Sequence, residues 1–106
     1  MFVRIVTMRP KGNTMPQLAK ALEEQVLPML RKQDGFEDDV CLVSAGSKKA
    51  IVISFWQRQE QADTYAATTY PQIVESVKHL LEKTPAVKSY DVISSTFYKT
   101  AVKATI

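Results

Sequence analysis

The short gap between two apolar segments near the middle of the chain restricts its fold most strongly. Residues 36–45 and 50–56 are rich in the β-branched, aliphatic and aromatic residues that are typical of β-strands. The break between them is centred on Gly46-Ser47-Lys48. A connection this short cannot lead to a parallel strand, so the sequence predicts that the two segments pair as an antiparallel hairpin.

Further strands and helices are predicted on both sides of this hairpin. Residues 2–8 predict a first strand, because they are apolar and β-branched and are followed by a run of turn-forming residues. Apolar residues recur at helical spacing through residues 14–31 and 69–83. A short helix is predicted at residues 59–67, and a fourth strand at residues 87–95.

The long helix that is predicted to start at Thr14 and to stop at Asp34-Gly35 carries its own start and kink signals. Thr14-Met15-Pro16-Gln17 has the spacing of a capping box, with Pro tolerated in the first turn. Thr69-Tyr70-Pro71-Gln72 repeats this pattern. Pro28 predicts a kink, because it has no N–H for the carbonyl of Glu24. The complete order is strand, helix, strand, strand, helix, strand. This order predicts an α+β, ferredoxin-like βαββαβ fold with helices on one face of an antiparallel sheet.

Both faces of the predicted sheet carry large apolar side chains. Along the third strand, Ile51, Ile53 and Phe55 point to one side, and Val52, Ser54 and Trp56 to the other. The helices can cover only one of these faces, so the other requires a partner or a ligand cavity. A homodimer that stacks two such sheets is the simplest solution, because a symmetric contact needs only one self-complementary patch.

Composition excludes several classes of function. A chain of 106 residues with 45% hydrophobic residues forms one domain. The net charge of +3 comes from scattered Lys and Arg residues, so we expect no nucleic-acid partner. No apolar run is long enough for a membrane span, so no membrane partner is expected. The single histidine excludes a multi-histidine metal site.

The single cysteine, Cys41, cannot form an internal disulfide, which favours a reducing, cytoplasmic location. A cysteine in a strand is more often a small core residue than a nucleophile, and we expect this of Cys41. The alternating tail at residues 97–106 is either an edge strand, an arm that reaches a partner subunit, or a frayed terminus. We therefore divide the chain into a domain at residues 1–96 and a tail.

The chain resembles the antibiotic biosynthesis monooxygenase family of dimeric α/β barrels. Each motif alone is weak, but together they cover essentially residues 1–96. The motifs are Glu24-Gln25-Val26-Leu27-Pro28-Met29-Leu30-Arg31, Asp34-Gly35-Phe36, Ser54-Phe55-Trp56, then Glu60, Ala62 and Tyr65, Tyr70-Pro71, and Tyr90-Asp91-Val92. The resemblance implies a homodimer with facing sheets. It also implies an oxidoreductase, a monooxygenase of a small aromatic or quinol substrate that works without metal or other cofactor.

Four residues are candidates for this chemistry. Trp56 ends the third strand and suits the wall of a ligand pocket, where its indole N–H is a donor for a substrate oxygen. His79 is the default base, because it alone titrates near neutrality. Tyr65 and Tyr70 flank the turn between the two later helices and can donate hydrogen bonds into a pocket. We assign His79 and Tyr65 as catalytic, and Trp56 and Tyr70 as ligand-binding; for each, ordinary packing or solvation is the alternative.

Two other functions remain open. One is a non-catalytic dimeric module that binds a small hydrophobic molecule. The other is haem degradation, because the haem-degrading branch of the family has this fold. That branch uses an Asn in the first strand, where this chain has Thr7, and a Trp in the second helix, near the position of Tyr65. It also uses a His at a position that corresponds to several residues before His79 in this chain. We therefore rank haem degradation below the cofactor-free reaction.

Overall fold

Four antiparallel strands form one sheet in the order β2-β3-β1-β4. We obtained a computed structural model of the chain, which describes residues 1–46 and 48–98. The strands are β1 (Phe2–Met8), β2 (Phe36–Val43), β3 (Ala50–Trp56) and β4 (Ala86–Asp91). β1 and β3 have the predicted bounds, and β2 and β3 pair as the antiparallel hairpin that the short gap requires.

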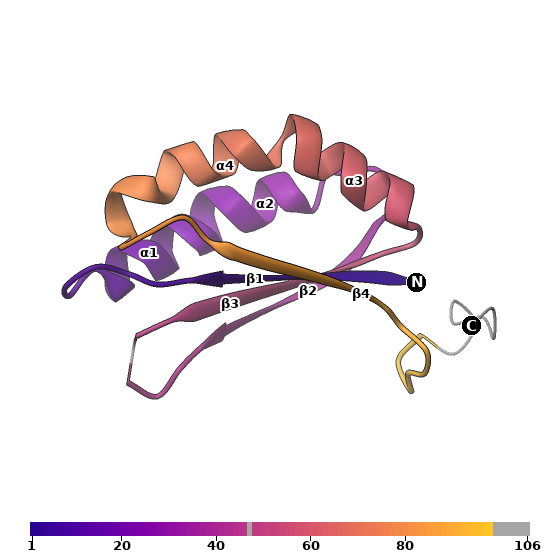
Figure 1. The fold of residues 1–106 in the computed structure, drawn as a ribbon, viewed down its shortest axis with the longest axis horizontal. Coiled ribbons are helices and arrows are strands. Elements are labelled where there is room, and N and C mark those ends of the chain that lie inside the picture. The colour runs from indigo at the N-terminus through magenta and orange to yellow at the C-terminus, as the bar shows by residue number, and fades with distance from the viewer. Residues whose placement is uncertain (47, 99–106) are drawn as a thin grey trace.

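Helices cover one face of this sheet (Figure 1). The first helical segment comprises α1 (Met15–Ala21), the π-helical turn η1 (Leu22–Val26) and α2 (Leu27–Leu30). The second comprises α3 (Gln59–Thr68), α4 (Tyr70–Val77) and the 3₁₀ turn η2 (Lys78–Leu80). The predicted ferredoxin-like α+β fold is therefore confirmed.

The first helical segment is irregular just before Pro28, as the sequence predicts. The N–H of Leu27 donates to the carbonyl of Leu22, five residues earlier, instead of the usual four. Pro28 has no N–H with which to resume the α-helical pattern at Glu24. The π-helical turn is therefore the form that the predicted irregularity takes, and it places Val26 over the sheet.

The predicted capping box at Thr14 is wrong. No side chain caps α1, because Thr14 has φ −93° and ψ 6° and is not in the extended conformation of an N-cap. Its hydroxyl instead donates to the carbonyls of Lys11 and Leu80, at 2.8 and 2.9 Å. Thr14 therefore ties the start of α1 to the end of η2.

The core lies between the helices and the sheet. One side chain in every two along β1 and β3 points into it, and the first helical segment supplies an apolar stripe at helical spacing. The largest fully buried side chains are Trp56, Met8, Leu18, Leu22, Leu30 and Val77. Burial of one such aliphatic side chain stabilises the folded state by about 1.5–3 kcal/mol. This layer therefore provides most of the hydrophobic stabilisation of the fold.

The opposite face of the sheet has no helices and carries exposed apolar side chains. The register places Val40 and Leu42 of β2 beside Ile53 and Ile51 of β3, as the alternation predicts. Val40 is 43% exposed and Leu42 is 45% exposed. Tyr90 of β4, opposite Val3 of β1, is 51% exposed. We call this surface the open face.

After β4 the chain continues on the side of the open face (Figure 1). The ring of Tyr98 packs against Phe55, with 5.4 Å between centroids, and its hydroxyl donates to Asp38 at 3.0 Å. The fourth strand ends at Asp91 rather than at residue 95, so the predicted strand is too long at this end. The tail prediction mostly concerns residues 99–106, which lie outside the described residues. None of the helices in the described part of the chain is long and apolar enough to cross a membrane.

Candidate functional site

A row of polar residues crosses the helix-covered face of the sheet, where the surrounding positions are apolar. Arg4 of β1 pairs in register with Ser54 of β3 on one side and with Ser89 of β4 on the other. Ser54 in turn pairs with Asp39 of β2. Side chains in register on adjacent strands point to the same face, so the row lies on the side of the helices. Arg4 and Ser54 at its centre are buried, whereas Ser89 at the β4 edge is exposed.

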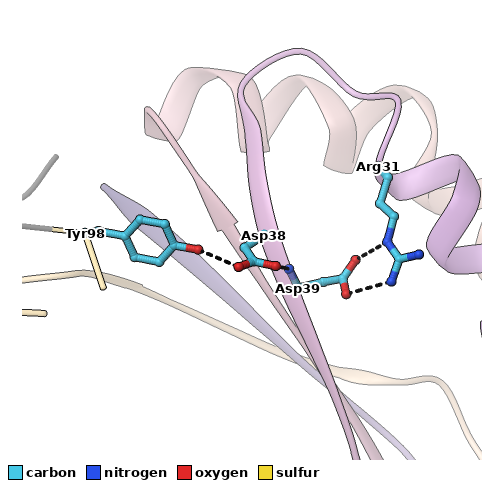
Figure 2. A network of polar contacts seen from close by, with 4 residues as sticks. All are labelled: Arg31, Asp38, Asp39 and Tyr98. Carbon is cyan, nitrogen blue, oxygen red and sulfur yellow. Dashed lines mark hydrogen bonds and ion pairs between the residues drawn. The ribbon is translucent and has the colours of Figure 1, made fainter. Parts of the chain in front are cut away.

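The Asp39 end of the row is fully paired. Figure 2 shows the guanidinium of Arg31, which follows α2, against this carboxylate: Nε donates to Oδ2 at 2.9 Å and Nη2 to Oδ1 at 3.1 Å. The hydrogen bond and the charge of Asp39 raise the pKa of Arg31 above its usual range. This two-point contact uses both oxygens of the carboxylate.

Arg4 at the centre of the row is buried and unpaired. Arg4 is only 7% exposed. Among the described residues, neither Nε nor Nη2 of Arg4 has a hydrogen-bond partner, and both atoms are buried. The guanidinium carbon lies 4.6 Å from the centroid of the Tyr70 ring and 5.6 Å from that of Tyr65. These rings offer a cation–π contact but accept no conventional hydrogen bond from the guanidinium.

The two tyrosines beside Arg4 are neutral hydrogen-bond donors at physiological pH. Burial raises the pKa of Tyr65 to about 12, although the charge of Arg4 acts in the opposite direction. Burial also raises the pKa of Tyr70. The hydroxyl of Tyr70 is buried and, within the described part of the chain, has no hydrogen-bond partner. Arg4 and Tyr70 thus supply unsatisfied donors at the same place.

The side chains of Arg4 and Tyr70 border a small, mostly apolar cavity between the helices and the sheet. Its volume is about 10 Å³, roughly the space that one water molecule needs. Val26 of η1 and Leu30 of α2 lie among its lining residues, so the π-helical turn borders the cavity directly. The lining is Arg4, Val6, Met8, Val26, Leu30, Val52, Ser54, Tyr65, Tyr70 and Ile73.

Three of the four predicted site residues come together here. The rings of Trp56 and Tyr65 are 5.1 Å apart between centroids, and those of Tyr65 and Tyr70 are 6.1 Å apart. Tyr65 and Tyr70 line the cavity, whereas Trp56 lies behind Ser54. The indole N–H of Trp56 donates to the Ser54 hydroxyl at 2.9 Å, so it orients Ser54 instead of facing the cavity.

His79 and Cys41 lie elsewhere. His79 is exposed on η2 and is not among the residues that line the cavity. The expectation that Cys41 is a core residue is wrong, because Cys41 is exposed. Its strand, β2, is the edge of the sheet. A residue there has a neighbouring strand on one side only, which leaves it more accessible than a residue of β1 or β3.

The sequence analysis missed Arg4 and the role of Ser54. The signal was present in the alternation: Phe2, Val6 and Met8 point into the core, so Arg4 between them must do the same. A charged residue at an inward position of a central strand is rare and is normally paired. Acid–base candidates are residues that titrate near neutrality, and arginine is not one of them.

A larger hollow of about 850 Å³ lies at the other end of the sheet. Exposed residues line most of it, including Arg9, Asn13, Lys48 and Glu82. None of the buried, unpaired side-chain atoms found among the described residues belongs to its lining. The cavity at Arg4 is therefore the better candidate site. Within residues 1–46 and 48–98, no three His, Cys, Asp or Glu side chains are placed to hold a metal ion together.

Comparisons with known proteins agree with this description of the fold. No family model and no curated protein matches the sequence. Among solved structures, a proposed antibiotic biosynthesis monooxygenase from Deinococcus radiodurans is similar, with a TM-score of 0.76 and 15% identity over 90% of this chain and 95% of that chain. A monooxygenase from the gene ActVA-Orf6 of Streptomyces coelicolor, solved with nanaomycin D, has a TM-score of 0.75 and 18% identity over 89% of this chain and 88% of that chain.

A third similar structure is a variant of MhuD with two manganese protoporphyrin IX molecules bound per active site. Its TM-score is 0.71, at 17% identity over 91% of this chain and 98% of that chain. At such low identity these likenesses establish the fold but not the reaction. The chain therefore has the ferredoxin-like fold of the antibiotic biosynthesis monooxygenases, in agreement with the resemblance seen in its sequence.

Proposed function

We propose that the protein is a monooxygenase that oxidises a small aromatic or quinol substrate without a metal or other cofactor. The observation that carries this proposal is the cavity beneath the helices, where aromatic rings surround an unpaired buried guanidinium. Its fold is also that of solved proteins described as monooxygenases. An electron-rich ring, an anion-stabilising group and a space with little water are what such a reaction needs.

In this reaction the substrate supplies the electrons. The ionised substrate reacts with dioxygen; one oxygen atom enters the ring and the other leaves as water. Arg4 stabilises the substrate anion, because its charge is permanent and its Nε and Nη2 are unpaired. Tyr70 donates a further hydrogen bond from its buried hydroxyl. Tyr65 forms an aromatic wall, with Trp56 packed behind it.

No role inside the cavity is assigned to His79, because it is exposed and outside the lining. The titratable residues that do line the cavity are Arg4, Tyr65 and Tyr70, and none of these accepts a proton at neutral pH. The substrate must therefore bind in its ionised form. His79 remains a predicted base only for a step that takes place outside the cavity.

Binding of an aromatic ring requires the cavity to enlarge from its volume of about 10 Å³. Two parts of the wall are suited to this movement. The π-helical turn at Leu22–Val26 interrupts the regular helical hydrogen bonds, and such turns are frequent at functional sites. Tyr70 is only partly buried, so a rotation of its side chain opens the cavity toward solvent.

The alternative is a non-catalytic module that binds a small hydrophobic molecule, and the mostly apolar lining of the cavity supports it. Haem degradation has less support, because His79 lies outside the cavity and a porphyrin is far larger than the space beside Arg4. For either function we propose a homodimer that pairs two open faces, in a reducing, cytoplasmic setting.

Oxygen uptake with a panel of quinols and hydroxynaphthalenes, in metal-free buffer, tests the proposed reaction. We expect uptake by the wild-type protein and a loss of at least about tenfold in Tyr70→Phe, which removes one donor to the anion. The His79→Ala variant decides where the base acts: retained uptake agrees with a substrate that binds already ionised. The absence of uptake across the whole panel contradicts the proposed reaction and favours the binding module.

A further inference from the structure

We propose that the cavity binds the carboxylate of a small aromatic acid, held at two points by the guanidinium of Arg4. This inference names the substrate class of the cavity and rests on the proposed function for the view that the cavity is a substrate site. It makes the substrate a hydroxylated aromatic ring that also carries a carboxylate.

The first support comes from a comparison of two arginines in the same molecule. Arg31 binds the carboxylate of Asp39 through Nε and Nη2. Arg4 leaves the same two atoms, Nε and Nη2, buried and unpaired. These atoms form one edge of the planar guanidinium and match the two oxygens of a carboxylate. The internal pair Arg31–Asp39 thus shows the contact that Arg4 lacks.

The second support is the charge balance around Arg4. A buried cation without a counter-charge is costly, and arginine cannot lose its proton to avoid this cost. The lining of the cavity contains no carboxylate. The acidic residue in the same polar row is Asp39, and both of its carboxylate oxygens already accept hydrogen bonds from Arg31. An anionic ligand supplies the missing charge.

The third support distinguishes a carboxylate from other oxygen anions. No residue of the lining accepts a proton at neutral pH, so a phenol binds as an anion only from the small fraction that is already ionised in solution. A carboxylic acid is already ionised in water at this pH. The buried hydroxyl of Tyr70, whose pKa is raised by burial, remains a donor and adds a third hydrogen bond to the same group.

Isothermal titration calorimetry with benzoate and with benzamide tests the proposal. The two probes have nearly the same shape, but only benzoate carries the charge and the two equivalent oxygens. We expect benzoate to bind at least about tenfold more tightly, because hydrogen bonds between two charged groups are the stronger ones. The affinity should stay constant between about pH 6 and 9, where neither benzoate nor arginine titrates.

Three variants identify the group that is responsible. Arg4→Met removes the charge and should abolish the preference for benzoate. Arg4→Lys keeps the charge but lacks the paired N–H groups, so it should bind benzoate with intermediate affinity. Arg9→Met removes an exposed cation that directly follows the same strand, outside the cavity lining, and should bind both probes like the wild type. Circular dichroism melts verify that each variant is folded.

The proposal is overturned if benzoate and benzamide bind equally, if neither binds, or if Arg4→Met retains the preference. Its failure is separable from failure of the proposed function. Uptake of oxygen with neutral quinols but no benzoate preference refutes only the carboxylate. Benzoate binding that depends on Arg4, without oxygen uptake on any quinol or any hydroxylated benzoate, refutes the reaction and leaves the carboxylate site in place.

Discussion

The guanidinium carbon of Arg4 lies 4.6 Å from the centroid of the Tyr70 ring, inside the layer between helices and sheet. The contact joins the middle of the central strand β1 to the first turn of α4. Both residues border the same cavity, and both have buried donors without a hydrogen-bond partner among the described residues. A core built for stability alone would not keep such a pair, because each unsatisfied buried donor costs free energy.

Replacement of the buried charge should therefore stabilise the fold. We expect Arg4→Met to raise the free energy of unfolding by about 1–4 kcal/mol, as found when buried charges are exchanged for apolar side chains of similar size. Urea unfolding followed by circular dichroism measures this change. A lower stability in Arg4→Met would mean that Nε and Nη2 of Arg4 do have partners in the folded protein.

Removal of the Tyr70 hydroxyl should also raise the free energy of unfolding, but by less than Arg4→Met does. Tyr70→Phe keeps the ring over Arg4 and removes a buried group without a partner. We expect unfolding free energy to stay equal or to rise by up to about 2 kcal/mol, while benzoate affinity and oxygen uptake fall. A thermal melt, read beside the two functional assays, separates this pattern from simple misfolding, in which all three would decline together.

Stability should fall at alkaline pH because of Tyr65. Burial raises its pKa in the folded protein to about 12, from 10.0 for an unperturbed tyrosine. Well below pH 10 the phenol is protonated in both the folded and the unfolded state, so the free energy of unfolding does not depend on its titration. Between pH 10 and 12 the unfolded state loses the proton first, so stability decreases as pH rises. Urea unfolding at stepped pH should show this decrease, and Tyr65→Phe should make it shallower.

Two glycines with positive φ provide a matched test of local packing. A Cβ on Gly35, which has φ 81°, would collide with the side chain of Gln61, whereas a Cβ on Gly12, with φ 52°, would meet nothing within 4 Å. Both alanine variants should lose about 1–2 kcal/mol from the left-handed backbone. Gly35→Ala should lose clearly more than Gly12→Ala in urea unfolding, and equal losses would count against the close packing of Gln61.

The open face should hold two subunits together. We expect the wild-type protein to sediment as a dimer at low micromolar concentration, because exposed apolar surface of this extent favours a partner. Leu42→Lys places a charge among Val40, Ile51 and Ile53 and should give monomers. Asp63→Lys, which introduces the same side chain on exposed α3, should remain dimeric. A monomeric wild-type protein would remove the basis of the paired barrel.

The fold followed from the sequence because short-range signals agreed with one another. The gap at Gly46-Ser47-Lys48 required a hairpin, and the alternation along residues 50–56 assigned each side chain to its face. The cap at Thr14 could not be predicted, because its hydroxyl bonds to Leu80, which is distant in the chain. The site was predicted only in its aromatic part. Arg4 was not predicted, because it stands out only by its lack of hydrogen-bond partners. That lack depends on how the side chains pack in three dimensions.

Asp38 and Asp39 are adjacent in β2, yet they serve opposite layers of the molecule (Figure 2). One carboxylate receives Tyr98 from the segment beneath the sheet, and the other receives Arg31, which directly follows Leu30 of the cavity wall. A single peptide unit thus separates the contacts on the two sides of the sheet. If two subunits pair through their open faces as proposed, this peptide unit is the shortest covalent path from their contact to the wall of the cavity.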